Sequence, residues 1–155
     1  MSLYLIIKTL HILSATVLFG TGMGIAFFMF RTAFTDAVPQ KLYAARNTVL
    51  ADACFTLPAV ILQPVTGVWL ILQAGFNPLN QWLVITYGLY LLAGACWLPV
   101  VWIQLQQRKM LEHSVTTGTP LPARYHRLFK WWFALGWPAF TALVVIFYLM
   151  VAKPV

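Results

Sequence analysis

The sequence predicts an all-α fold, a bundle of four transmembrane helices. Three stretches of the chain carry no charged residue, 9–30, 53–107 and 131–152, and the middle stretch is more than twice as long as either of the others. Asn77, Pro78 and Asn80 interrupt the middle stretch near its centre. Because a helix of roughly 20 apolar residues crosses the hydrocarbon core of a bilayer, the three stretches contain four spans.

The composition excludes a soluble domain. Of the 155 residues, 61% are hydrophobic and 8% are charged, and the mean hydropathy is +0.81, whereas soluble domains carry roughly 25% charged residues. Four spans leave only short connections and almost no tails. We therefore expect a single transmembrane domain over residues 1–155, with spans at about 4–30, 50–73, 82–105 and 131–152.

Positive charge is concentrated in two of the connections. Of the 10 Lys and Arg residues, Lys8 and Lys153 lie near the termini, and the others lie in the first and third connections: Arg31, Lys41, Arg46, Arg108, Lys109, Arg124, Arg127 and Lys130. Because short cytoplasmic loops are enriched in Lys and Arg, both termini are predicted to face outward (N-out/C-out) in a multi-pass protein of the bacterial inner membrane. These basic residues indicate contact with membrane lipid and no nucleic acid partner.

The first span, 4–30, carries a histidine at membrane depth. His11 lies one turn deeper than Lys8, whose flexible stem lets its ammonium group reach the headgroups. His11, Ser14 and Thr21 share one broad face of the helix. Since a polar group facing lipid is costly, we expect this face to point into the bundle.

The second span, 50–73, has a polar stripe at helical spacing, formed by Asp52, Thr56, Gln63, Thr66 and Gln73. We expect the stripe to face inward, because an Asp at the centre of a membrane helix costs about 2.5–3.5 kcal/mol. Asp52 is expected to form a structural ion pair with Arg46. Arg127 and Lys130 are the alternative partners, and a proton relay is the alternative role for Asp52.

Four prolines lie within the predicted spans: Pro58, Pro64, Pro99 and Pro138. Each proline removes a backbone donor and frees a carbonyl, so the helices are expected to kink there. Kinked helices would widen the bundle around a ligand. The alternative is that these prolines are ordinary features of membrane helices, whose neighbours satisfy the freed carbonyls.

The third span, 82–105, has an aromatic face with a glycine notch, formed by Tyr87, Tyr90, Gly94, Trp97 and Gln104. Such a face could hold a flat ring system, so Tyr87, Tyr90 and Trp97 are candidate cofactor-binding residues. The alternative is packing against Trp132 and Trp137 of the fourth span, 131–152. The third helix is expected to continue beyond the membrane to His113 and to end before Gly118, because glycine and proline stop helices there.

Several motifs are shared with known proteins: KTLHIL at 8–13, LPAVILQPVTGVWL at 57–70, GACWLPVVW at 94–102 and RLFKWWFALGWPAFTALVVIFYLMVAKP at 127–154. Together they resemble an uncharacterised bacterial family of predicted integral membrane proteins, a domain of unknown function. More distantly, the Lys-x-Leu-His-Ile opening, the Pro-Ala followed by Gly-x-Trp and the Lys-Pro end are similar to the HemJ-type protoporphyrinogen IX oxidases. Copper-resistance D-type membrane proteins show a still looser resemblance.

The resemblance to the oxidases implies a haem b whose iron is bound by His11. Where those enzymes have a functional lysine, this chain has Thr86, and near the position of their second histidine it has Cys96 or Trp97. The departure at Thr86 speaks against protoporphyrinogen oxidase activity, although His11 still matches the haem ligand.

Three functions remain open from the sequence. The first is a haem-binding or redox-associated protein, oxidoreductase-like if haem binds His11. The second is a small transporter or channel subunit with the Asp52 stripe along its path. The third is a non-catalytic scaffold subunit, in which His11 hydrogen-bonds to Gln63 or Tyr87 and Asp52, Gln63 and Arg46 are structural polar residues. A homodimer or a larger membrane complex is the expected assembly.

Overall fold

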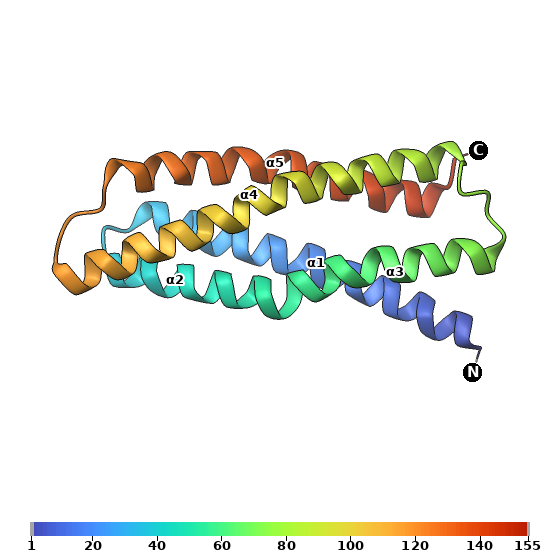
Figure 1. Cartoon of the computed structure of the whole chain (residues 1–155), viewed down its shortest axis with the longest axis horizontal. Coiled ribbons are helices and arrows are strands. Elements are labelled where there is room, and N and C mark those ends of the chain that lie inside the picture. The colour runs from blue at the N-terminus through green and yellow to red at the C-terminus, as the bar shows by residue number, and fades with distance from the viewer. Residues whose placement is uncertain (1, 155) are drawn as a thin grey trace.

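The computed structural model describes residues 2–154 and is all α-helical. Its long helices lie side by side, with both chain termini at the same end of the longest axis (Figure 1). They are α1 (Leu3–Arg31), α2 (Val38–Ala51), α3 (Leu57–Ala74), α4 (Gln81–Thr117) and α5 (Ala123–Ala152). Two short segments, the 3₁₀-helix η1 (Thr32–Phe34) and the π-helix η2 (Asp52–Thr56), complete the described chain.

The four predicted spans are confirmed as long apolar helices. Within residues 2–154, four helical stretches are long and apolar enough to cross a membrane: Leu3–Phe34, Val38–Ala74, Gln81–Thr117 and Ala123–Ala152. The second stretch begins about three turns before the predicted start at residue 50, because α2, η2 and α3 form one continuous rod. The connection after α1 is therefore mostly helix rather than loop.

Glycines end α3 and α4, and the sequence predicts the second of these stops, at Gly118. Gly75 follows α3 with φ 70°, and Gly118 follows α4 with φ 69°, both in the left-handed region that glycine adopts without a steric penalty. The continuation of α4 beyond residue 105, as far as Thr117, is also confirmed.

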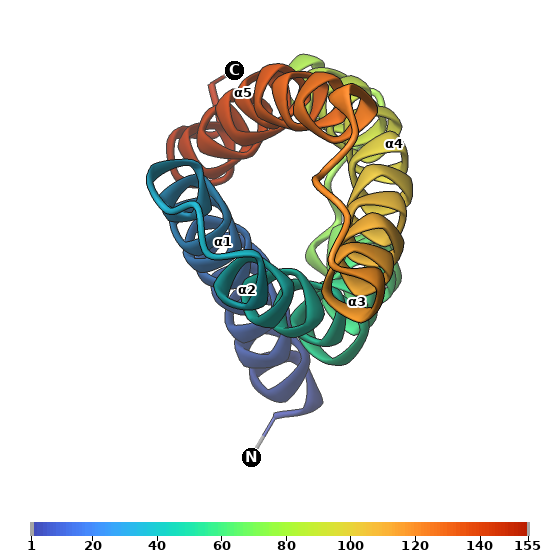
Figure 2. The same cartoon turned by 90° about the vertical axis from the view of Figure 1, so that its left-hand side faces the viewer.

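The helices pack mainly as two pairs. The most extensive packing is between α4 and α5, and α1 packs chiefly along α3. The two pairs are joined mostly where α2 packs against α4. Seen along the long axis, the helices surround a central region, with α5 and α4 on one side and α1, α2 and α3 on the other (Figure 2).

We call the end of the bundle at the α1–α2 and α4–α5 connections the basic end, because the Lys and Arg residues of both connections lie there (Figure 1). Its core is a cluster of Leu42, Ala45, Leu111 and Tyr125, contributed by α2, α4 and α5. Leu111 has no exposed surface. This small core fastens the two helix pairs together at the basic end.

Three of the four prolines lie inside continuous helices: Pro64 in α3, Pro99 in α4 and Pro138 in α5. Pro58 differs, because it lies in the first turn of α3 directly after η2. There the backbone N–H of Leu57 bonds to the carbonyl of Asp52, one residue farther back than in an α-helix. The sequence predicts a proline kink at this point but not the π-helical turn.

Truncation of Leu111 tests the core of the basic end. Leu111→Ala should lower the stability of the protein in detergent by about 2–5 kcal/mol, because it leaves a cavity in a fully buried cluster. Unfolding by titration with sodium dodecyl sulfate would measure the change. Val115→Ala is the control: Val115 lies one turn away on α4 and is 46% exposed, so its truncation should change stability by less than about 0.5 kcal/mol. Equal losses in the two variants would contradict the assigned core.

Candidate functional site

A cavity of about 440 Å³ lies between the two helix pairs. Residues of α1, η2, α3, α4 and α5 line it, and its walls are almost entirely apolar. Aromatic rings from α4 and α5 form much of the surface: Tyr90, Trp97, Trp132, Phe133, Trp137 and Phe140. A volume of this size is within the range of pockets that bind small organic molecules, roughly 300–1,000 Å³.

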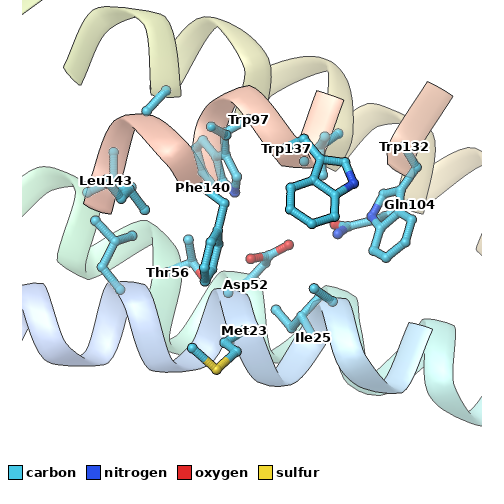
Figure 3. Close-up of a pocket in the computed structure, with 18 of the residues that line it drawn as sticks. Met23, Ile25, Asp52, Thr56, Trp97, Gln104, Trp132, Trp137, Phe140 and Leu143 are labelled. Atoms are coloured by element: carbon cyan, nitrogen blue, oxygen red, sulfur yellow. The ribbon is translucent and has the colours of Figure 1, made fainter. Parts of the chain in front are cut away.

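Asp52 is the only acidic residue on the cavity wall. Its side chain extends from η2 toward the centre of the cavity, with Thr56 beside it and Trp97 and Gln104 on the facing helix α4 (Figure 3). Asp52 is 7% exposed, and its Oδ2 atom has no hydrogen-bond partner. Among residues 2–154, no Lys, Arg or His lines the cavity. An ionised carboxylate here would therefore lack a counter-charge, which is costly in an apolar interior.

Three of the other residues with unpartnered polar atoms, Thr56, Trp97 and Gln104, line the cavity with Asp52. Among the described residues, buried side-chain atoms without a hydrogen-bond partner occur at Asp52, Thr56, Trp97, Gln104 and Gln107. Gln107 follows Gln104 by one turn of α4 in the direction of the basic end. Buried polar groups in folded proteins are normally satisfied by protein or water. Their concentration at one place marks this part of the interior as a binding region for water or a ligand.

The cavity reaches the lipid-facing surface between α1 and α5. Phe27 on α1 and Trp137 on α5 both line it, yet they are 59% and 62% exposed. Side chains that line a cavity and are also exposed must lie at its mouth. The gap follows from the helix pairing, because α1 packs on α3 and α5 packs on α4.

His11 lies outside this cavity. It precedes Leu18, the first cavity-lining residue on α1, by roughly two helical turns. Its Nδ1 atom is 2.7 Å from the Thr66 hydroxyl on α3, and its backbone carbonyl accepts a hydrogen bond of 2.8 Å from the Gln63 amide. Gly67 makes room for the ring, since a Cβ atom there would lie 3.3 Å from His11 Cε1. The polar face of α1 thus points inward as predicted, against α3.

The Thr66 hydroxyl determines which nitrogen of His11 carries the proton. Thr66 Oγ1 donates to the carbonyl of Leu62 at 2.6 Å, so it accepts from His11 Nδ1–H. The ring is then the tautomer whose Nε2 lone pair is free. A hydrogen bond at one ring nitrogen that leaves the other free is the usual arrangement of a metal-binding histidine.

The structure does not bring the predicted cofactor residues together. Tyr90 and Trp97 line the cavity with Asp52, whereas Tyr87 is 39% exposed and does not line it. The Tyr90 hydroxyl donates to the backbone carbonyl of Val60 on α3. His11 is bonded to α3 and is separate from these rings. Among residues 2–154, no group of three or more His, Cys, Asp and Glu side chains could hold a metal ion.

The predicted ion pair of Asp52 is wrong. Arg46 instead pairs with Glu112 on α4, with 3.1 Å between Nε and Oε1, and Arg108 pairs with the same oxygen at 3.0 Å. In the described part of the chain, Asp52 forms no ion pair with Arg46, Arg127 or Lys130. The two residues do not pair because their side chains point in different directions: Arg46 is exposed at the basic end, whereas Asp52 points into the interior.

Glu112 lies beyond the predicted membrane span, and it is the residue that the sequence analysis missed at the basic end. Hydrogen bonds from Arg108 and Arg46 hold the pKa of Glu112 below its ordinary value. Spacing could have identified the Arg108 contact, since residues four apart share a helix face. The contact with Arg46 depends on the packing of α2 against α4 and has no signal in the sequence.

Replacement of Asp52 by leucine tests whether the carboxyl group anchors the fold through an ion pair, as the sequence predicts, or has no cationic partner, as in the structure. Because Asp52 has no cationic partner and its Oδ2 atom lacks a hydrogen bond, Asp52→Leu should leave the abundance of the protein unchanged and raise its stability by about 1–3 kcal/mol, the cost of an unsatisfied buried polar group. Yield from membranes and denaturant titration would measure both quantities. A collapse in abundance would show that the carboxyl group anchors the fold. Thr48→Val is the control for polar-to-apolar exchange at a buried position of the same rod outside the cavity.

Comparison with known proteins agrees with the membrane architecture. The family model described as "Predicted integral membrane protein (DUF2269)" matches residues 5–154. No curated protein and no solved structure matches the chain. The family model and the four apolar helices together make this a multi-pass integral membrane protein. Because the match covers nearly all of the sequence, the chain belongs to DUF2269, a family of predicted integral membrane proteins of unknown function.

Proposed function

We propose that this protein is a small membrane transporter subunit, which moves a small molecule through the cavity around Asp52. The observation that supports this function is a buried carboxyl group without a partner on the wall of a cavity of about 440 Å³. Ionisable groups inside membrane proteins are costly, and they are commonly found on substrate or proton pathways. A purely structural Asp would be expected to have a bonded partner.

Two features of the fold support exchange between the cavity and its surroundings. The mouth between α1 and α5 opens toward lipid, so an apolar molecule can enter from the bilayer. In the other direction, the Gln104 side-chain oxygen and the Gln107 amide have no partner, and both residues lie from Asp52 toward the basic end. Both side chains are buried, so water would reach them, and through them the carboxyl group, only when the helices move apart.

The architecture also supports relative movement of the helix pairs. The α1–α3 pair and the α4–α5 pair are joined mainly at the basic end, through α2 and α4. Rocking of one pair against the other would change the width of the cavity while that connection is kept. Four helices enclose only a small volume, so we propose that the working unit is a homodimer. The clustered Lys and Arg residues support our proposal that the basic end lies in the cytoplasm and that both termini lie outside, in the bacterial inner membrane.

Proton-coupled flux tests this function. Purified protein would be reconstituted in liposomes with an imposed pH gradient. Ethidium, phenylnaphthylamine or anilinonaphthalenesulfonate would then be added, and dissipation of the gradient would be followed with the pH indicator pyranine. These aromatic compounds are cationic, neutral and anionic, respectively. At least one of them should dissipate the gradient in liposomes that contain the wild-type protein. Asp52→Asn should lose the effect, because the amide neither binds nor releases a proton at this position.

Asp36→Asn is the matched control for this experiment. It makes the same chemical change at an exposed residue between η1 and α2 that does not line the cavity, and it should behave as the wild type. Failure of all three compounds, or an Asp52→Asn variant that matches the wild type, would overturn the transporter function.

Haem binding at His11 is a second candidate function. It is favoured by the free Nε2 lone pair that the Thr66 hydrogen bond leaves on the imidazole. Haem bound there would supply one-electron redox chemistry. The surrounding residues fit less well, because Tyr90 and Trp97 line the Asp52 cavity and no second histidine lies near His11 in the described helices. We derive no catalytic step from this site.

An absorption spectrum tests the haem candidate. Protein purified in mild detergent from haem-sufficient cells should show a Soret band that shifts on reduction with dithionite, and His11→Ala should remove the band. His113→Ala is the control, since His113 is exposed near the end of α4. A colourless wild-type protein, or a band that persists in His11→Ala, would rule out this ligand.

A further inference from the structure

We propose that the cavity binds a lipophilic organic cation, which exchanges for a proton at Asp52. This inference rests on the proposed transporter function and specifies the class of its substrate. It is argued from the charge, the aromatic walls and the mouth of the cavity.

The charge of the cavity favours a cation. Asp52 is its only acidic group, and the described wall contains no basic side chain that could neutralise a carboxylate. Helices α1 and α5 contribute no titratable side chain to the wall, and α4 contributes Tyr90, whose hydroxyl is bonded to the Val60 carbonyl. Two ligands can therefore make the Asp52 position electrically neutral: a proton or a monovalent cation. An anion would be repelled by the carboxylate form and would find no basic side chain on the described wall.

The walls favour a cation that is large and apolar. Trp97 faces Asp52 from α4, and Trp137 and Phe140 face it from α5 (Figure 3). The faces of aromatic rings attract cations, most strongly at tryptophan and in desolvated sites. A strongly hydrated ion such as Na⁺ would lose its water here and gain few oxygen ligands in return. An organic cation loses little hydration and fills the apolar volume.

The position of the cavity mouth also favours a lipophilic organic cation. Lipophilic cations partition into bilayers, and the mouth of the cavity lies between α1 and α5 at residues that face lipid. Phe27 and Trp137 at this mouth are aromatic. The ligand can thus pass from the bilayer to the carboxyl group along an aromatic surface.

Binding is a balanced exchange. The protonated Asp52 carboxyl group breaks its O–H bond and releases the proton to water. The cation then pairs with the resulting carboxylate, so the net charge inside the cavity is unchanged. No oxidant, reductant or other reactant takes part. Two measurable properties follow: about one proton is released for each cation bound, and the apparent affinity falls as the pH is lowered, since protons compete for the same group.

Tetraphenylphosphonium and tetraphenylborate provide a pair of probes with the same shape and opposite charge. Their binding to the full-length protein in dodecyl maltoside would be measured by equilibrium dialysis, and proton release would be measured in weakly buffered solution with a pH indicator. The phosphonium should bind at least roughly tenfold more tightly than the borate, with release of about one proton. Asp52→Asn should weaken phosphonium binding by at least roughly tenfold and abolish proton release. Asp52→Glu, which keeps the charge, should retain both.

A tryptophan pair tests the aromatic walls. Trp137→Leu should weaken phosphonium binding roughly twofold to fivefold, the effect of one partly exposed cation–π contact. Trp131→Leu is the matched control, because Trp131 lies on the same helix, is 59% exposed and does not line the cavity. It should bind as the wild type does. Since both residues are exposed, neither change should affect folding.

The outcomes distinguish the substrate class from the proposed function. Equal binding of phosphonium and borate, or equal phosphonium binding by the wild type and Asp52→Asn, would overturn the cation inference. If the flux assay nevertheless shows Asp52-dependent proton release with the neutral or the anionic compound, the transporter function stands and only the substrate class is wrong. Absence of both phosphonium binding and flux would overturn the two together.

Discussion

One electrostatic constraint dominates the interior of the bundle: a carboxyl group is buried in an apolar region without a counter-charge. Asp52 is 7% exposed, and neither an arginine nor a lysine reaches it. Removing a carboxylate from water without a partner is among the most costly events in protein folding. The group must therefore carry a proton or face a ligand cation. Proton exchange and ligand binding at Asp52 are two consequences of the same constraint.

The backbone around Asp52 has a local irregularity at the point where the side chain lines the cavity. The π-helical turn Asp52–Thr56 precedes Pro58, whose missing N–H would leave a gap in a regular α-helical ladder. Single π-turns occur frequently at functional sites, because they change the direction of side chains within an otherwise continuous helix. Here the turn joins α2, which packs on α4 at the basic end, to α3, which packs on α1. The carboxyl group thus sits where the rod passes from one helix pair to the other.

Helix pairing also separates the two polar regions of the interior. His11 and Gln63 are held between α1 and α3 by short hydrogen bonds and have their partners within that pair. Asp52 and Gln104 lie between the pairs, where several polar atoms lack partners. The hydrogen bonds of the first region stabilise the α1–α3 contact and leave the Nε2 lone pair of His11 free. The second requires water or a ligand, and for this reason we place the function there.

The sequence by itself determined the membrane class, the number of spans and the inward direction of most polar side chains. These properties follow from runs of apolar residues and from helical periodicity, which are local and additive along the chain. Only the tertiary structure decided the partners: Arg46 pairs with Glu112, His11 bonds to Thr66, and Asp52 has no cationic partner among the described residues. It also removed His11 and Tyr87 from the cavity of Tyr90 and Trp97. Periodicity predicts which face of a single helix is buried. Side-chain partners depend on which helices pack together and on how those helices are aligned along the axis of the bundle.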